Sequence, residues 1–308
     1  NIPTANFWKV KTLKEAKDIG YITKYKLENA VLASPTTFFL LVILGFPVIL
    51  SLVYGFSETS FETLRSPEFS GLNNFHKVTT DDTFWQAVWF SFRFGSITAI
   101  LECALGLALA VYLAPLTQKN GWIVAVLIIP MIVAPAMMGL MYRLVLNEFA
   151  GPIPYYLYNW LGWSPAFLSP QNVFTTVVLA ETFQWTPFTF LLFLTAYRSI
   201  PQEMREAATV DGTRPWRLFW KLELPLMMPT VFIAAFIRFI DGFRVFDNIY
   251  TLVGAGPGGS TTSMSIYIYE TFLRRGEIGK SMAAAILLFA AAFILLSFAQ
   301  RLMRRTFR

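Results

Sequence analysis

The chain has little of what disulfide frameworks, metal sites and soluble catalytic centres need. Its 308 residues include one cysteine, Cys103, and one histidine, His76, which excludes an intrachain disulfide and a histidine-rich metal site. Only 14% of the residues are charged, against about 25% in a typical soluble domain. With 55% hydrophobic residues and a mean hydropathy of +0.52, the composition indicates a protein that crosses a membrane several times. The net charge of +6 does not point to nucleic acid, because the basic residues flank apolar runs.

Long apolar runs are abundant. Six of them reach the roughly 20 residues that a spanning helix needs, so we expect an all-α membrane protein with six transmembrane helices. Internal prolines and glycines predict that the helices pack together or against a partner, since neighbouring helices must satisfy the backbone groups that each break frees. The runs cover about 32–56, 88–114, 121–146, 172–197, 226–250 and 281–303, and the breaks are expected at Gly45, Pro47, Gly106, Pro130, Pro135, Pro187 and Gly242.

The distribution of basic residues predicts the orientation. Sixteen Lys and Arg lie in the N-terminal tail, the 115–120 and 198–225 connections and the C-terminal tail, whereas five lie in the other three connections. Basic residues collect on the cytoplasmic side, so both termini and the 198–225 loop are expected to be cytoplasmic. Residues 1–31 form a lysine-rich segment, for which we expect either a helix on the membrane surface or solvated disorder. Asn1 is not an initiator methionine, and we expect the natural chain to begin before it.

One polar stretch lies between the fourth and fifth apolar runs. Residues 206–225 read EAATVDGTRPWRLFWKLELP. The small side chains of Ala207 and Ala208, which follow Glu206, would let another surface approach closely. Gly212 would supply the backbone freedom for a turn, and Pro225 would open the next helix. Aromatic and basic residues alternate irregularly between the turn and the proline, which predicts a segment half buried against its own protein and half offered to a partner.

This stretch resembles the cytoplasmic loop of the membrane subunits of bacterial ABC importers. Glu206-Ala207-Ala208, Gly212, Leu222 and Leu224-Pro225 meet every spacing of that pattern, with Leu in place of the usual Ile. GLNNF (71–75), WSPAFLSP (163–170), WTPF (185–188) and the 246–272 stretch beginning FDNIYTLVGAGPGG resemble the maltose-type carbohydrate-uptake permeases. The resemblance covers about 270 residues, and FDNIY favours the first of the two permeases usually paired in that family.

The resemblance implies a partnership in the bacterial cytoplasmic (inner) membrane. Residues 32–308 would form the permease domain, paired with a second related permease. Two ATP-binding subunits would lie below and a periplasmic or extracellular substrate-binding protein would dock outside. The chain would not be an enzyme and would need no cofactor of its own, because ATP would be bound and hydrolysed by the partner subunits. The residues expected to couple to an ATPase subunit are Glu206, Ala207, Ala208, Asp211, Gly212 and Pro225.

Ionisable residues inside the spans are candidates for a substrate path. Arg238, Asp241, Arg244 and Asp247 follow one another every three residues and would form a ladder of alternating charge along one side of a helix. The ladder could be a structural set of ion pairs or could line the path, and Glu102, Arg93, Arg143 and Glu181 could pair similarly. Trp185 adds an aromatic ring, on which sugar rings can stack. The candidate path residues are Glu181, Gln184, Trp185, Thr186, Asp241, Arg244, Asp247 and Asn248.

Two other classes of function stay open. The chain could be an ABC importer permease for a polyamine, phosphate or sulfate, or it could be a stand-alone transporter or membrane-embedded enzyme. Residues 254–262 (GAGPGGSTT) are not a phosphate-binding loop, because no Lys follows the last glycine and the segment is expected on the outer side. Asp81-Asp82 is expected to be a solvated helix cap, and no spacing of residues predicts a metal site.

Overall fold

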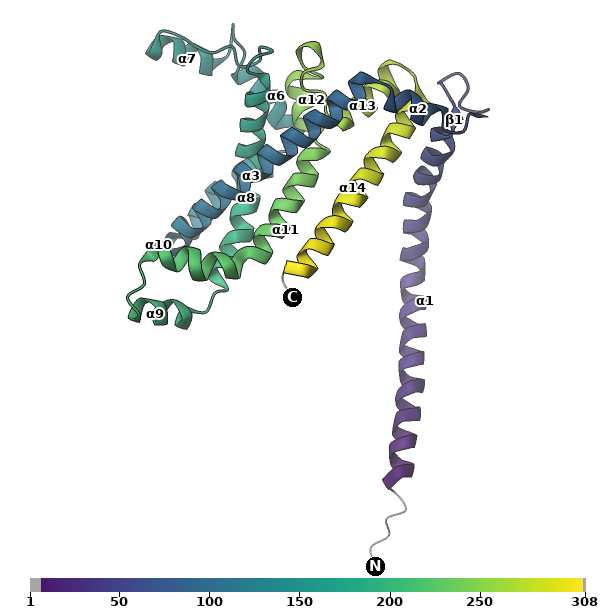
Figure 1. Cartoon of the computed structure of the whole chain (residues 1–308), viewed down its shortest axis with the longest axis vertical. Coiled ribbons are helices and arrows are strands. Elements are labelled where there is room, and N and C mark those ends of the chain that lie inside the picture. Colours follow the sequence, from purple (N-terminus) through teal and green to yellow (C-terminus); the bar gives the residue numbers. More distant parts are fainter. Residues whose placement is uncertain (1–6, 307–308) are drawn as a thin grey trace, which may run out of the picture. The chain divides into compact units, whose positions relative to one another are not determined.

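The computed structural model describes residues 7–306, which are mostly helical (Figure 1). Helix α1 (Phe7–Gly55) runs without a break through Pro35 and Pro47. Its residues 29–55 form a candidate membrane span, and no residue in the most apolar part of this span is buried by the chain. Helix α1 thus has no boundary at residue 31. Residues 1–6 lie outside the described part, and the surface position of residues 1–31 stays a prediction.

Three long helices form the centre of the part that begins at Tyr54. Helix α3 (Asp82–Lys119) packs against α8 (Val173–Arg198) and α11 (Leu224–Phe243). A Cβ on Gly242 would lie only 2.8 Å from the Cα of Gly95, so the absence of side chains lets α3 and α11 touch. A Cβ on Gly106 would likewise collide with Thr189 of α8. The sequence prediction that Gly106 and Gly242 break their helices is therefore wrong, since both are packing contacts inside continuous helices.

The third apolar run is interrupted next to Pro130 and Pro135, where the sequence predicted breaks. Residues 121–146 form α4 (Gly121–Leu127), α5 (Ile129–Ile132) and α6 (Pro135–Val145). Pro130 and Pro135 each lie in the first turn of a new helix, and the backbone at Val133 is extended. Gln184 Nε2 of α8 donates to the carbonyl oxygen of Val133 at 2.9 Å and satisfies a group that the break frees. Five helices among the described residues are long and apolar enough to cross a membrane, so six continuous spans are not confirmed.

Two other prolines are accommodated without a break. Helix α8 continues through Pro187, where the sequence predicted an interruption. Helix α10 (Pro215–Leu218) runs into the π-helical turn η1 (Phe219–Glu223) and then directly into α11. Pro225 lies in the first turn of α11, as predicted, although η1 joins α11 to α10 without a break. In the wider π turn, Leu224 N–H bonds to Phe219 O. This turn accommodates the proline, which cannot take part in the regular pattern of α-helical hydrogen bonds.

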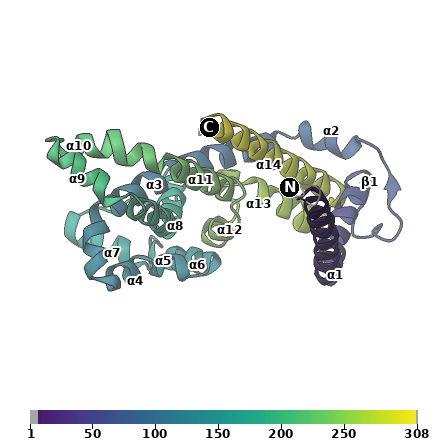
Figure 2. The same cartoon turned by 90° about the horizontal axis from the view of Figure 1, so that it is seen from below.

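Most of the short elements gather at the two ends of the bundle (Figure 1), and the view from below shows α3, α8 and α11 side by side (Figure 2). The strands pair antiparallel, with Ser57 opposite Phe69. The buried Asn74 of GLNNF donates to the carbonyl oxygens of Gly55 and Ser57, at 3.1 and 2.8 Å, which holds α2 to the start of the hairpin. One end carries β1 (Ser57–Glu58), β2 (Glu68–Phe69), α2 (Asn73–Thr79), α7 (Pro152–Leu161), α12 (Asp247–Val253), η2 (Pro257–Gly259), α13 (Met264–Tyr269), η3 (Glu270–Arg274) and the start of α14 (Ile278–Thr306), and the opposite end carries α9 (Gln202–Val210) and α10.

Candidate functional site

Helix α9 is an exposed helix with a well-formed end. Glu206 and Ala207 are exposed, and Ala208 is half-buried. Gly212 has φ +69°, a left-handed conformation that glycine adopts without strain. Gly212 N–H bonds to Thr209 O and Thr213 N–H bonds to Ala208 O, both at 3.0 Å, which is the Schellman arrangement of a helix C-terminus. The structure thus gives Gly212 the turn position that the sequence predicted and leaves Glu206 facing outward.

Arg205 fixes this helix to the bundle. Its Nε donates to Glu223 Oε1 at 2.8 Å, and its Nη2 donates to the carbonyl oxygen of Tyr197 at 2.8 Å. The guanidinium also lies 4.1 Å from the centre of the Tyr197 ring. Because Tyr197 belongs to α8 and Glu223 leads into α11, one side chain ties α9 to both helices. The rest of the loop exposes two tryptophans, Trp216 (70%) and Trp220 (49%), together with the basic Arg214, Arg217 and Lys221.

A second polar group of residues lies inside the bundle and is centred on Arg238. This side chain is 1% exposed. Its Nε donates to Glu102 Oε2 of α3 at 2.5 Å, and its Nη2 lies 3.4 Å from Glu181 Oε1 of α8. Its Nη1 donates to Asp241 Oδ2 at 3.2 Å. Two fully buried carboxylates from different helices therefore share one buried guanidinium, and we call Glu102, Glu181 and Arg238 the buried charge cluster.

Amide side chains extend the cluster toward α12. Asn248 Nδ2 donates to Glu181 Oε2 at 2.5 Å and to Gln184 Oε1 at 2.8 Å. The other side-chain atom of this residue, Asn248 Oδ1, is buried without a hydrogen-bond partner in the chain. Trp185 covers the guanidinium of Arg238, whose Cζ lies 4.5 Å from the centre of the indole ring. The fourth-span residues predicted for a path therefore meet the ladder of α11 directly.

A pocket of about 350 Å³ opens beside the cluster. Arg244 lines it and pairs with Asp241 at 3.0 Å, so both arginines of the pocket already have carboxylate partners. Two predicted residues take positions that differ from their predictions. Asp247 lines the pocket but is not a rung of the ladder, because α11 ends at Phe243. Thr186 bonds to Thr182 O within α8 and lines a different, apolar pocket. The lining residues are Pro135, Glu181, Trp185, Arg238, Asp241, Arg244, Val245, Phe246, Asp247 and Asn248.

Comparison with known proteins identifies the family. Residues 19–308 match the family model described as the binding-protein-dependent transport system inner membrane component. The chain belongs to this family. It is 35% identical over 227 residues to the trehalose/maltose transport system permease protein MalF of Thermococcus litoralis, covering 72% of this chain and 75% of the relative. The sulfoquinovosyl glycerol transport system permease protein SmoG of Agrobacterium fabrum is 29% identical over 282 residues, with 91% of each covered.

The fold of the permease agrees with a solved structure. A bacterial ABC transporter involved in the import of the acidic polysaccharide alginate contains a chain with a TM-score of 0.80 and 21% identity. The match covers 95% of this chain and 100% of that one. As a member of this family, the permease is a multi-pass inner-membrane component of a transport system that depends on a binding protein. Among the described residues, no group of His, Cys, Asp and Glu is arranged to hold a metal.

Proposed function

We propose that this permease forms half of the translocation path of a sugar importer and couples to an ATPase subunit through residues 206–225. One observation carries the proposal: Arg205 fastens the exposed α9 to α8 and to the helical path into α11. Those two helices supply Glu181, Trp185, Arg238 and Asp241 to the pocket. A displacement of α9 would therefore reach the pocket through continuous helices.

The chemistry of the pocket favours an uncharged sugar. Arg238 and Arg244 are both paired with carboxylates, so neither offers an unengaged cation to an anionic substrate. Asn248 Oδ1 can accept a hydrogen bond from a hydroxyl, and Trp185 presents an aromatic ring of the kind on which sugar rings stack. The trehalose/maltose permease among the relatives supports the same substrate class.

The mechanism would be alternating access. Closure of the ATPase pair on ATP would push the docked α9 segment, and the two permeases would swing between inward-open and outward-open states. Glu206 would make the polar contact with the ATPase, since it is exposed on the helix that meets the partner. The small side chains of Ala207 and Ala208 would allow close docking, and Asp211 and Gly212 would shape the turn. In this arrangement residues 32–308 form the permease domain, and residues 1–31 and both termini lie on the cytoplasmic side.

Charge reversal at the loop tests the coupling. In the complete complex reconstituted in liposomes with its binding protein, we expect Glu206→Lys to abolish ATP-driven sugar uptake while the subunits stay assembled. Glu203→Lys is the matched control, because Glu203 is also exposed on α9 but precedes the docking residues. Gly212→Pro should abolish uptake too, since proline cannot adopt φ +69°. Normal uptake by both Glu206→Lys and Gly212→Pro in intact complexes would refute the docking role.

A substrate screen tests the class of solute. The same liposomes would be given uncharged disaccharides, sugar phosphates, inorganic sulfate or phosphate, and polyamines, each with the binding protein encoded beside the permease. We expect ATP-dependent accumulation of an uncharged sugar. Accumulation of a sugar phosphate alone would overturn the preference for an uncharged sugar, and accumulation of inorganic sulfate, phosphate or a polyamine alone would make the chain a permease for a non-sugar solute. Transport by the purified chain without ATPase subunits would instead indicate a stand-alone transporter.

A further inference from the structure

The connection between α6 and α8 has an unusual composition. Residues 149–173 contain no charged residue, and seven of these 25 residues are aromatic. Such a segment would be poorly hydrated if it projected into water. Tyr and Trp, which make up five of the seven aromatics, are the residues that collect where a membrane meets water.

Helix α7, within this connection, is covered very little by the rest of the chain. Pro154 is the helix residue that is buried. Tyr156 is 55% exposed and Trp160 is 80% exposed, and beyond the ends of the helix Phe149 is 97% exposed. An apolar helix that is exposed around most of its circumference needs a cover other than water.

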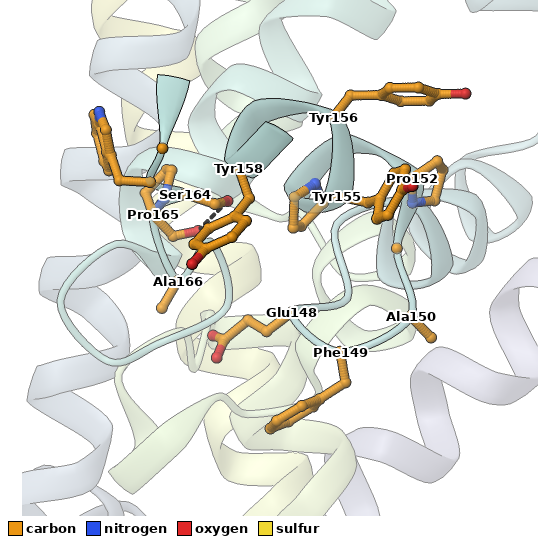
Figure 3. Close-up of a pocket in the computed structure, with 14 residues that line it drawn as sticks. Glu148, Phe149, Ala150, Pro152, Tyr155, Tyr156, Tyr158, Ser164, Pro165 and Ala166 are labelled. Carbon is orange, nitrogen blue, oxygen red and sulfur yellow. Dashed lines mark hydrogen bonds between the residues drawn. The ribbon is translucent and has the colours of Figure 1, made fainter. Parts of the chain in front are cut away.

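The two sides of α7 are not alike. Ile153, Tyr156 and Trp160 share one side at helical spacing, and the rings of Tyr156 and Trp160 lie 5.9 Å apart. Asn159 falls off this stripe, about 100° around the helix from Trp160. Figure 3 shows the ring of Tyr156 pointing away from Glu148, whereas the ring of Tyr158 lies toward it. Tyr156, Tyr158 and Glu148 line a pocket of about 750 Å³ between α7 and its flanking loops, whereas Ile153 and Trp160 do not.

The direction of α7 indicates what covers it. Figure 1 shows α7 running across the direction of α8 at the end of the bundle opposite to α9. A helix that runs across the direction of the spans, at the end of the bundle, lies in the plane of a membrane interface. We propose that α7 lies in the headgroup layer of the outer leaflet, with the stripe formed by Ile153, Tyr156 and Trp160 in contact with lipid. The membrane is a better match than a soluble partner protein, because the whole segment is uncharged and rich in Tyr and Trp.

Site-directed spin labelling tests this placement. The single native cysteine, Cys103, can be replaced by alanine, so that Trp160→Cys or Asn159→Cys carries the only label. The complete complex of permeases and ATPases would be placed in lipid nanodiscs without the binding protein. Collisions of each label with oxygen, which partitions into lipid, and with a water-soluble nickel chelate would be compared. Ser66→Cys is the aqueous reference, because Ser66 is exposed in the loop between β1 and β2 at the same end of the bundle.

The proposal predicts opposite orders of accessibility. The label at residue 160 should collide more with oxygen than with the nickel chelate, the label at residue 66 should show the reverse, and the label at residue 159 should fall between them. Nickel accessibility at residue 160 equal to that at residue 66 would place α7 in water and overturn the proposal. Protection of residue 160 from both reagents would mean that a protein subunit covers the helix, which would also overturn it. Neither result bears on coupling to the ATPase subunits, so the placement of α7 and the proposed function are tested independently.

Discussion

The interior of the bundle and the loop that contains α9 both depend on an arginine that joins several helices. Arg238 is 1% exposed and meets carboxylates from α3, α8 and its own helix. Arg205 is 20% exposed and meets one carboxylate, one carbonyl and one ring. A charge inside a bundle cannot fall back on water when a partner is removed, whereas a charge in the loop can. An arginine of this kind therefore joins helices in the interior, whereas under the proposed coupling it positions α9 for its partner.

The largest effect should follow from removal of Arg238. Arg238→Met leaves Glu102 and Glu181 facing each other in the interior without their shared cation. Breaking a buried pair in this way costs about 3–5 kcal/mol, so we expect loss of most folded protein from the membrane. Fluorescence-detected size-exclusion chromatography after a heating series would measure it.

The neighbouring arginine is the control. Arg244→Met should shift the melting temperature little, because Arg244 is 67% exposed and its partner Asp241 keeps the bond from Arg238. The double variant Glu102→Gln with Arg238→Met should be more stable than Arg238→Met alone, because it removes one of the unpaired carboxylates. An Arg238→Met protein with the melting temperature of the wild type would show that the cluster does not hold the helices together.

Asp81, at the end of the bundle opposite to α9, offers an intermediate case. It caps α3 by accepting from Thr83 N–H, and its Oδ2 accepts from Lys280 Nζ at 2.8 Å and from Tyr267 Oη at 2.9 Å. It is thus a helix cap as predicted, but it is part of an ion-pair network and is 15% exposed, not freely solvated. Asp81→Asn should lower stability by about 2 kcal/mol, because hydrogen bonds to a charged group are lost.

The effect of Asp81→Asn should depend on pH. Partial burial raises the pKa of Asp81, but the hydrogen bonds from Lys280, Thr83 and Tyr267 outweigh it and hold the pKa well below its usual range. A carboxyl with a lowered pKa stabilises the folded state above its unfolded pKa of about 3.9 and loses this contribution as the pH falls further. The difference in melting temperature between wild type and Asp81→Asn should thus be constant from about pH 7 to pH 5 and shrink below about pH 4. A constant difference throughout would contradict the network.

Contacts within one segment could be predicted from the sequence, and contacts between distant segments could not. The two ion pairs of Asp241 follow from three-residue spacing on one helix, and the Gly212 turn follows from the loop pattern. Arg238 and Glu102 are 136 positions apart, so no local pattern could pair them. The sequence does show a charged residue inside an apolar run. This pattern indicates that the charge is paired with another residue, but it does not identify that residue.

The prolines show a related limit. Helices are interrupted next to Pro130 and Pro135, whereas Pro187 and Pro225 lie where the helix continues. Whether a helix is interrupted at a proline depends on what satisfies the backbone groups left without a partner, or on whether a local change of helix geometry accommodates the proline. Gln184 reaches the break at Val133 from another helix, and a π turn forms before Pro225. Both compensations depend on the folded backbone and are not visible in the sequence.

The exposed region should respond more in coupling than in stability. Arg205→Ala should cost about 1–2 kcal/mol, since a charge-assisted hydrogen bond is lost at a partly exposed site. It should also free α9 from α8 and α11, so that ATP hydrolysis stimulated by the binding protein continues while sugar uptake per ATP falls. The double variant Arg205→Glu with Glu223→Arg should recover part of the uptake by restoring the pair. Equal losses of ATPase activity and uptake in Arg205→Ala would show that Arg205 affects docking of the ATPase subunit and not transmission of movement from α9 to the pocket.

The smallest expected effect concerns the turn at Gly212. A Cβ at this position would meet no atom within 4 Å, so alanine is opposed by φ +69° alone and not by a clash. The left-handed conformation costs an ordinary residue about 1 kcal/mol, and Asn pays less than Ala because its side chain can bond locally. Uptake should therefore fall in the order Gly212→Asn, Gly212→Ala, Gly212→Pro, with thermal stability almost unchanged in the first two. If Gly212→Asn reduced uptake as much as Gly212→Pro, the constraint at this position would be side-chain bulk at the docking surface and not backbone geometry. The loop would then fit its partner as closely as the helices of the interior pack together.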